Sequence, residues 1–437
     1  MSLELLQNMN GKACPCGKAH RFDTQLHIGA GVLARLPEIL QSYAAKTVFV
    51  LSDDNTYRAA GEKVCALLKK AGIKVVSYCF PEGAVEPDEK SVGSAFMHFD
   101  SKCDVIIGVG SGVINDIGKI LSCHSGKPYI IVATAPSMDG YASASSSMTR
   151  DGLKISLPSK SADVIIGDTD VLCQAPMHMM KSGLGDMIAK YISICEWRIS
   201  HIITGEYYCE EVANLIRIAL KRCTDHAQGL LRRDPDAVQA VFEGLVIGGV
   251  AMNYAGLSRP ASGVEHYISH IVDMRAVEFG TPMDLHGIQC AIGTAIALSA
   301  YEKLAKITPN REKALAYAKA FDKVTWEKEL RQLLGKGAEP MIALEEKEQK
   351  YDLSAHQMRL EIILENWQNI LEVMDQELPA KAQLDSLLTA LDIPSTLDAI
   401  GTPTALLPQI FRATKDIRDK YVLSRLGWDL GVLDELI

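Results

Sequence analysis

The chain lacks a long apolar run, a basic stripe and a secretion signal. Without about 18 consecutive apolar residues, no membrane span is expected. A net charge of −9, from 45 basic and 54 acidic residues, argues against nucleic acid as a partner. The first 22 residues have no basic start followed by an apolar block, so we expect a cytoplasmic protein.

A paired cysteine pattern is also missing. The eleven cysteines are odd in number, and most stand alone in apolar segments, as small buried residues do in a reducing compartment. One stretch differs: CPCGKAH offers Cys14, Cys16 and His20. Its C-x-C spacing is tighter than that of common zinc pairs, and zinc would need a fourth ligand. We interpret it as a surface hairpin, with a structural metal site as the alternative.

The chain has enough residues and a high enough hydrophobic content to form the cores of about two domains. The 437 residues are 48% hydrophobic and 23% charged, which is typical of a globular chain. Residues 1–173 alternate short apolar runs with helix-like segments, which predicts an α/β domain with a parallel sheet and helices on both faces. The predicted strands are 47–53, 73–80, 103–112, 127–137 and 162–172, and the helices between them are 56–72, 88–101 and 113–126.

From residue 174 the strand pattern stops, so residues 174–437 are predicted to form an all-helical domain. Segment 325–378 is highly charged and amphipathic, which indicates solvated helices that serve as a lid or an oligomer contact. A homo-oligomer, a dimer or larger, is therefore expected. The predicted helices are 174–203, 205–229, 233–255, 261–277, 284–304, 309–323, 326–376 and 378–437.

A glycine loop, GVGSGVINDIGK, begins at Gly108 directly after a predicted strand. Alternating glycines let the backbone approach a phosphate, and the helix that follows offers free N–H groups. The loop departs from the usual dinucleotide fingerprint, because Val113 stands where a third glycine is needed. Asp53, at the end of the first strand, is the candidate for the ribose; its charge favours NAD(H), unless a basic side chain nearby admits NADP(H). An ordinary turn between strand and helix is the alternative.

A second loop, ATAPSMDGYASASSSM over 133–148, also leaves a predicted strand. Its hydroxyls, Thr134 and Ser137, are candidate donors to a cofactor, and Asp139 is a candidate buried acid. An ordinary Ser/Ala loop explains the composition equally well.

The stretch SGVEHYISHIVDMRAVEFGTPMDLHG, residues 262–287, carries three histidines. His266 and His270 are four residues apart and share one face of a helix. His286 falls twenty residues after His266, so a helix, a turn and a second helix bring these two rings face to face. With the carboxylate of Asp186 they suit zinc, ferrous iron, nickel or manganese and leave positions open for a substrate. No cysteine is expected in this set, and satisfied core histidines are the alternative.

Several stretches together resemble the sn-glycerol-1-phosphate dehydrogenases: GVGSGVINDIGK, ATAPSMDGYASASSS, GLGDMIAKY, SRPASGVEHYISH and DLHG. The wider group includes glycerol dehydrogenase, iron-containing alcohol dehydrogenases and dehydroquinate synthase. The resemblance covers residues 25 to 300 and does not extend beyond 325. One departure is Val109: the family loop often begins with three glycines, where this chain has Gly108-Val109-Gly110.

The resemblance implies a role for individual residues. Asp186, His266 and His286 would hold the metal, and Asp139, Asp186 and His270 would contact the substrate, with Asp139 or His270 relaying the proton. The cofactor would contact Asp53, Gly110, Gly112, Val113, Ile114, Asn115, Asp116, Thr134, Ala135, Pro136, Ser137 and Ser143.

The implied reaction is the metal-dependent, NAD(P)H-linked interconversion of dihydroxyacetone phosphate and sn-glycerol 1-phosphate, with the metal as Lewis acid on the ketone oxygen. Arg259 and Lys154 are candidates to bind the phosphate of this small phosphorylated polyol. A glycerol dehydrogenase, a cyclase of the dehydroquinate synthase type, and a non-catalytic NAD-binding sensor with a structural metal are the alternatives.

Overall fold

The computed structural model describes residues 2–81, 83, 85–150 and 153–437. The chain forms two compact units: residues 1–187 with 214–257, and residues 188–213 with 258–437. The last strand of the parallel sheet ends at Asp168, shortly before the change of pattern predicted at residue 174. A boundary between folding domains at 173/174 stays a prediction.

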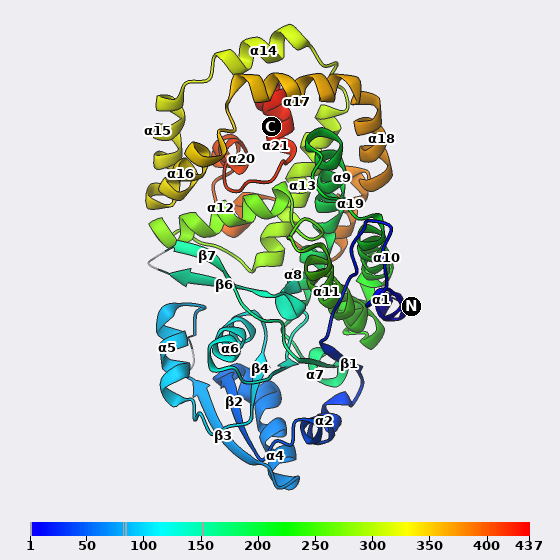
Figure 1. The fold of residues 1–437 in the computed structure, drawn as a ribbon, viewed down its shortest axis with the longest axis vertical. Helices are drawn as coiled ribbons and strands as arrows, with labels where there is room; N and C mark the ends of the chain where they lie inside the picture. Colours follow the sequence, from blue (N-terminus) through cyan, green and yellow to red (C-terminus); the bar gives the residue numbers. More distant parts are fainter. Residues whose placement is uncertain (1, 82, 84, 151–152) are drawn as a thin grey trace. The chain divides into compact units, whose positions relative to one another are not determined.

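The first unit is built on a six-stranded parallel sheet in the order β1-β8-β5-β4-β2-β3, which confirms the predicted α/β class (Figure 1). Its strands are β1 (Gln25–Gly29), β2 (Thr47–Asp53), β3 (Lys74–Phe80), β4 (Val105–Gly110), β5 (Tyr129–Ala133) and β8 (Val164–Asp168).

A separate antiparallel pair, β6 (Ser145–Arg150) and β7 (Leu153–Pro158), corrects the prediction that 133–148 is loop throughout. Ser146 and Met148 of β6 are buried, whereas Ser147 is exposed. The period-2 pattern is present, but three of its first four members are serines, so the hydrophobic signal of a strand was absent.

Both faces of the parallel sheet are covered. Successive side chains of each strand point to opposite faces, so every strand packs against the layers on both sides. Val48 and Val50 belong to one buried cluster with the helices of segments 36–42 and 62–70. Phe49 lies between them in sequence and packs instead on Phe99, with ring centroids 5.3 Å apart. The continuous apolar runs of these strands follow from this two-sided burial.

Helix α11 (Pro235–Ala255) is long and apolar enough, by length and composition, to cross a membrane. Within the protein, 83% of its most apolar window is buried, as in a core helix. The other helices of the first unit are α1 (Ser2–Met9), α2 (Leu36–Ser42), α3 (Asp54–Thr56), α4 (Glu62–Lys70), α5 (Glu89–His98), α6 (Gly112–Ser125), α7 (Thr169–Leu172), α8 (Met177–Ile188) and most of α10 (Glu210–His226).

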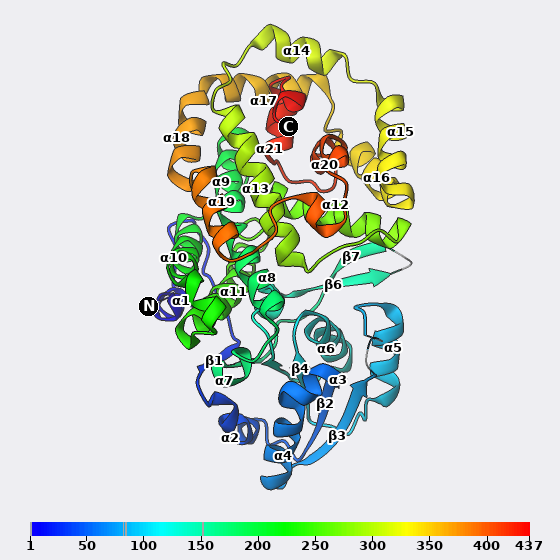
Figure 2. The ribbon, with the colours of Figure 1, turned by 180° about the vertical axis from the view of Figure 1, so that it is seen from behind.

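The second unit has no strand among its described residues, as predicted (Figure 2). The single long helices expected over 326–376 and 378–437 are broken into shorter ones. Gly335 ends one helix with a φ of 54°, and Asp352 caps the start of another through the N–H of Ala355. The helices are α9 (Lys190–Thr204), α12 (Val264–Phe279), α13 (His286–Leu304), α14 (Arg311–Lys319), α15 (Lys323–Leu334), α16 (Ala338–Glu348), α17 (Leu353–Glu365), α18 (Trp367–Glu377), α19 (Lys381–Ala390), α20 (Leu407–Thr414) and α21 (Leu423–Asp429).

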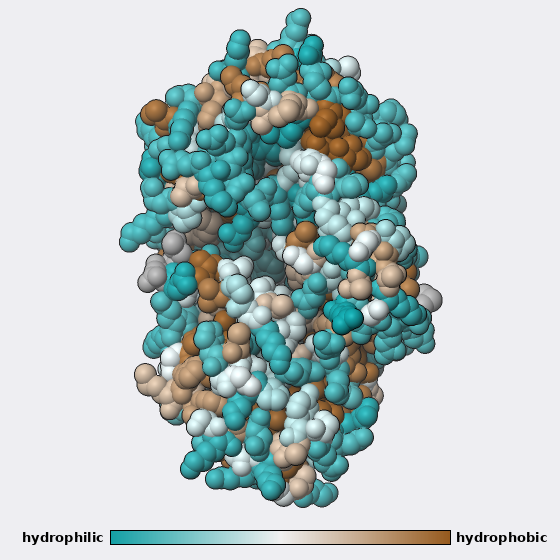
Figure 3. Space-filling model, viewed as in Figure 1, coloured by the Kyte–Doolittle hydropathy of each residue, from teal (hydrophilic) through white to brown (hydrophobic). Residues whose placement is uncertain are grey.

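The charged segment 325–378 carries exposed ion pairs, such as that of Arg331 with Glu327 and Glu339. Hydrophilic side chains predominate on the face of the second unit drawn in Figure 3, and one hydrophobic patch stands out at its upper right. Solvated amphipathic helices match this surface, and a role as lid or oligomer contact stays a prediction.

Candidate active site

The carboxyl ends of β2, β4 and β5 lie side by side at one edge of the sheet, because the three strands are parallel neighbours. This edge carries Asp53, Gly110 and the loop that begins at Thr134. The N–H of Thr134 donates to the carbonyl of Gly110 over 3.1 Å, which joins the two predicted cofactor loops. Ligands of open α/β sheets bind at such an edge.

Two of the loop glycines are required by packing within the protein. A Cβ at Gly108 would collide with the hydroxyl of Tyr129, and one at Gly110 would lie 2.6 Å from Cβ of Ile114. Gly112 differs, since a Cβ there would meet only Met138, at 3.5 Å. Gly112 is the first residue of α6, so the free N–H groups of that helix begin at a position where a Cβ would make only ordinary contact with Met138. This turn suits an anion, although the glycine pattern alone does not require one.

The second loop is held from inside by hydroxyl groups. The buried Tyr141 hydroxyl donates to the carbonyl of Ala135 over 2.7 Å and lies at hydrogen-bond distance, 3.1 Å, from Oγ of Ser111. Oγ of Ser111 is in turn bonded to Oγ of the buried Ser137. Burial raises the pKa of Tyr141, partly offset by these two hydrogen bonds. Ser137 therefore already has a partner inside the protein.

Lys119 was missed in the sequence. It is fully buried, pairs with Oδ1 of Asp116 at 2.8 Å, and donates to the carbonyls of Gly140 and Ser145. A buried lysine in this position fixes the loop around Asp139 against α6. The i, i+3 spacing of Asp116 and Lys119 in NDIGK was the available signal.

Helix α8 presses Asp186 against the same loop. A Cβ at Gly183 would overlap the carbonyl of Pro136, so the helix and the loop backbone are in direct contact. The N–H of Asp139 donates to Oδ2 of Asp186 over 3.0 Å. Asp186 is fully buried and Asp139 half-buried, so this contact sets the orientation of the Asp186 carboxylate.

Asp53 caps the first turn of α3. Its Oδ1 accepts from the N–H groups of Asn55 at 2.8 Å and Thr56 at 2.9 Å. These bonds give Asp53 a structural role at a helix N-terminus. Its predicted contact with a ribose stays a prediction.

The histidine cluster of the second unit lies on α12 and α13. Ring centroids of His266 and His286 are 5.0 Å apart, so the facing arrangement expected from the twenty-residue spacing is observed. The ring of His270 lies 6.4 Å from His266 and 6.0 Å from His286. The turn between the helices follows Gly280, whose φ is 65°.

Each ring of the facing pair has one nitrogen held by a polar neighbour. Nδ1 of His266 lies 2.7 Å from Oε1 of the fully buried Glu265, and Nδ1 of His286 lies 3.3 Å from Oγ of Ser269. Ser269 donates to Gln289, which donates to Asp273. Such contacts fix the ring tautomer and direct Nε2 toward a metal. The donor set therefore fits a divalent cation.

The expectation that no cysteine lies in this set is wrong. Sγ of Cys290 is 3.6 Å from Nε2 of His286, one turn along α13. Burial alone would raise the pKa of the Cys290 thiol, but the imidazoles of His266 and His286 outweigh it and lower that pKa below its ordinary value. The i, i+4 spacing of His286 and Cys290 was readable in the sequence.

A second buried carboxyl group, Glu196 on α9, lies at the start of α12 near Glu265. Its oxygens accept from the N–H groups of Val264 at 2.9 Å and Leu423 at 2.8 Å. Burial, followed by the charge of Glu265, raises the pKa of Glu196 to about 8. The environment of the histidine pair is thus crowded with acids.

Comparison with known proteins decides the family. A family model described as iron-containing alcohol dehydrogenase matches residues 27–176. A protein named glycerol-1-phosphate dehydrogenase (NAD(P)+) from Halalkalibacterium halodurans is 34% identical over 298 residues, 67% of this chain and 75% of that protein. One of the same name from Bacillus velezensis is 34% identical over 300 residues, 67% of this chain and 76% of it.

The chain belongs to the glycerol-1-phosphate dehydrogenase family. The fold agrees with the wider group: the crystal structure of glycerol dehydrogenase from Schizosaccharomyces pombe aligns with a TM-score of 0.61 at 18% identity, over 96% of this chain and 91% of that one. The resemblance read from the motifs is therefore confirmed. The roles of individual residues are not tested by these likenesses.

Within this family member, the structure brings the predicted residues together in two groups. The cofactor loops, Asp139 and Asp186 lie in the first unit, and the three histidines lie in the second. Asp186 as a ligand of the same metal stays a prediction.

One candidate for the substrate phosphate is already ion-paired. Arg259 is fully buried, with Nε 2.9 and 2.8 Å from the two carboxylate oxygens of Glu206. This ion pair occupies Nε and Nη2 of the guanidinium, whereas Nη1 has no hydrogen-bond partner among the described residues, so a contact of Arg259 with the substrate phosphate stays a prediction. Lys154 lies on β7 and is half-buried.

Proposed function

We propose that this protein interconverts dihydroxyacetone phosphate and sn-glycerol 1-phosphate with NAD(P)H and a divalent metal. The observation that carries the proposal is the facing pair His266 and His286, each with Nδ1 held by a neighbour. This pair stands in a chain one third identical to glycerol-1-phosphate dehydrogenases over two thirds of its length. The enzyme is proposed to be a cytoplasmic homo-oligomer.

The metal would be held by Nε2 of His266, Nε2 of His286 and the carboxylate of Asp186, with Cys290 beside them. A bound zinc, nickel or ferrous ion supplies Lewis acidity to a ketone oxygen. Glu265 and Ser269 keep the two imidazoles oriented before any substrate arrives. The buried hydrogen bond from Asp139 keeps the Asp186 carboxylate in one position. A precisely held donor set is what metal-assisted catalysis needs.

The cofactor would lie along the edge formed by β2, β4 and β5. NAD(P)H supplies the hydride when it is bound. The first turn of α6, from Gly112 to Asp116, offers N–H groups to its phosphates, and Thr134 to Ser137 with Ser143 line the adjoining loop. Oδ1 of the buried Asn115 has no hydrogen-bond partner within the described residues, so a donor from a ligand would satisfy it.

The proton that a ketone gains on reduction would come from Asp139 or His270. Both are half-buried, unlike the fully buried Asp186, so they can exchange protons with solvent. We assign both to substrate contact. The charge of Asp53 favours NADH over NADPH, because a carboxylate accepts a ribose diol and repels a 2′-phosphate.

A glycerol dehydrogenase is the second candidate. It is favoured by one observation: the ion pair with Glu206 already occupies Nε and Nη2 of Arg259, so this candidate phosphate ligand has only Nη1 left to offer. A non-catalytic sensor with a structural metal stays an alternative, because Cys290 adds a fourth potential donor to Asp186, His266 and His286, and a shell of four protein ligands is typical of a structural metal.

The deciding experiment is NADH oxidation by metal-reconstituted protein, offered dihydroxyacetone phosphate and, separately, dihydroxyacetone. We expect oxidation with the phosphate ester alone, lost on chelation and restored by zinc or nickel. Oxidation with the unphosphorylated ketone would move the protein to glycerol dehydrogenase activity. If neither ketone is reduced by protein loaded with metal and cofactor, the proposed reaction is wrong.

A further inference from the structure

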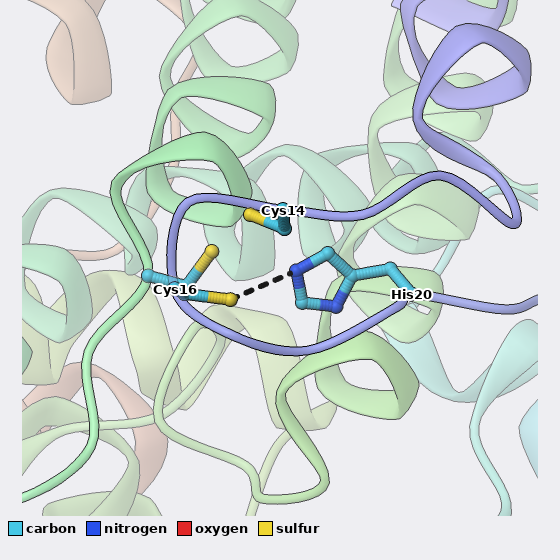
Figure 4. A group of neighbouring side chains, drawn as sticks. Cys14, Cys16 and His20 are labelled. Carbon is cyan, nitrogen blue, oxygen red and sulfur yellow. Dashed lines mark hydrogen bonds between the residues drawn. The ribbon is translucent and has the colours of Figure 1, made fainter.

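A second cluster of metal-ligating side chains lies in the first unit, in the hairpin formed by residues 10–22. Sγ of Cys14, Sγ of Cys16 and a ring nitrogen of His20 all lie within 4.8 Å of one another. Sγ of Cys16 is 3.5 Å from Nε2 of His20. Figure 4 shows the three side chains turned toward one another inside the loop of the hairpin. None of the three belongs to the proposed active site.

The hairpin is a tight turn closed by hydrogen bonds. The N–H of Gly17 donates to the carbonyl of Cys14, and the N–H of Cys14 donates to the carbonyl of Lys18, both over 2.9 Å. Gly17 has a φ of 84°, which only glycine adopts without strain. The base is closed by Asn10, whose side chain exchanges two hydrogen bonds of 2.8 Å with the backbone of Phe22. The backbone therefore fixes where the two thiols point.

His20 is oriented as metal-binding histidines are. Its ring is only 2% exposed and stacks on Tyr254, with centroids 5.1 Å apart. Its Nδ1 lies 3.1 Å from the carbonyl oxygen of Tyr254, which can only accept, so Nδ1 carries the proton. Nε2 then presents its lone pair, and Nε2 is the nitrogen that faces Cys16. A histidine ligand whose other nitrogen donates to a backbone carbonyl is the usual arrangement at a metal.

We propose that Cys14, Cys16 and His20 bind a divalent cation of the zinc class as a structural site. Two thiolates and one imidazole are the ligands that zinc prefers, and binding would release the two thiol protons to solvent. In a tetrahedral zinc site with Zn–S of about 2.3 Å, two sulfurs lie about 3.8 Å apart, within the 4.8 Å that encloses the present donors. A fourth donor, from the chain or from water, completes the shell.

The site would fasten the N-terminal hairpin to the end of α11. Besides the contact of His20 with Tyr254, Nζ of Lys18 donates to the carbonyl of Ala255 over 3.2 Å. These two carbonyls are the last of α11, which a helix leaves without partners of its own. A metal that fixes the hairpin would also hold His20 and Lys18 at the last carbonyls of this buried helix.

The test isolates the second site by removing the first. The variant H266A/H286A, loaded with zinc and dialysed, is expected to retain one zinc per chain, and adding C14S/C16S is expected to remove it. X-ray absorption of the zinc in H266A/H286A should show sulfur at about 2.3 Å and nitrogen at about 2.0 Å. The matched control, C123S on the exposed Cys123, keeps the metal. No retained zinc, or a shell without sulfur, would overturn the proposal.

The serine variants could lose zinc because they unfold, so a second pair of variants compares a residue that can bind the metal with one that cannot. H20C leaves three thiols and is expected to retain the zinc, whereas H20A is expected to bind it at least tenfold more weakly. Cobalt in place of zinc should give thiolate charge-transfer absorption in H266A/H286A that disappears with C14S/C16S. Equal zinc affinity in H20A and H20C would also contradict the proposal. The fourth donor is identified by the same zinc titration on serine variants of the remaining cysteines.

Discussion

The two clusters of potential metal ligands differ in how the chain assembles them. Cys14, Cys16 and His20 come from seven consecutive residues of one hairpin. His266 and His286 come from two helices and are twenty residues apart. The first arrangement depends on a single turn, and the second on the packing of α12 against α13.

Their surroundings differ as well. Behind His266 stands a buried carboxylate, Glu265, with Glu196 close by, whereas behind His20 stands a backbone carbonyl. A charged partner makes the imidazole more basic and its site sensitive to pH, while a carbonyl only orients the ring. Under the two proposals, histidine serves catalysis at the helical cluster and structure at the hairpin.

The largest expected effect separates the two roles. Replacing His266 and His286 together by alanine should lower kcat/KM by at least about a thousandfold, because both nitrogen donors of the proposed catalytic metal are lost. The hairpin metal should remain. NADH oxidation and the zinc content of the same preparation measure both. Full activity in H266A/H286A would show that the helical cluster is not the catalytic one.

The next effect concerns the carboxylate that orients His266. We expect E265Q to weaken metal binding at the histidine cluster by about 10- to 100-fold, the usual range for such partners. S269A should have a smaller effect, since Oγ of Ser269 lies 3.3 Å from His286 whereas Glu265 lies 2.7 Å from His266. Competition with a chromogenic chelator gives both affinities. An equal effect of the two variants would mean that the charge of Glu265 adds nothing.

The same contrast explains what could be predicted from the sequence. β2, predicted over 47–53, is observed over Thr47–Asp53, because its apolar run reflects burial on both faces. The close approach of the His266 and His286 rings was predicted from their spacing and from a turn between two helices. Both predictions used local or periodic patterns, which can be recognised in a single sequence.

Features that depend on packing were not predicted. The β6–β7 pair was hidden because β6 begins with three serines, and one of its two buried positions is Ser146 rather than an apolar residue. The pairing of Arg259 with Glu206 joins residues 53 positions apart, and no pattern announces it. Cys290 and Lys119 did have local spacing signals, but only their burial shows that those spacings are used.

A third, intermediate effect tests the acid environment of the histidine cluster. The pKa of Glu196 is raised to about 8 by burial, so the folded protein binds a proton there that the unfolded chain has lost above about pH 4.5. This contribution to the free energy of unfolding is fully present below pH 4.5 and is lost as pH rises through 8. In E196Q that loss should disappear, so the stability difference between E196Q and the original chain should move in favour of E196Q between pH 5 and 9.

Chemical denaturation across that pH range measures this difference. C123S serves as the control, because Cys123 is exposed and belongs to neither of the two clusters of potential metal ligands, so the slope of its stability with pH should stay unchanged. A difference between E196Q and the original chain that does not vary with pH would show that Glu196 is ionised in the folded protein throughout.

The smallest expected effect concerns Gly17, which forms the turn of the hairpin. Because Gly17 has a φ of 84°, G17A should cost roughly 1 kcal/mol at the turn that places the two thiols. If the turn builds the metal site, that cost appears as a zinc affinity about fivefold weaker there, while the histidine cluster is unaffected. G93A, in the interior of α5 where a Cβ meets nothing within 4 Å, should instead stabilise the protein by about 0.5–1 kcal/mol. A G17A variant that loses stability but keeps full zinc affinity at the hairpin would mean that the thiols are positioned by something other than the turn.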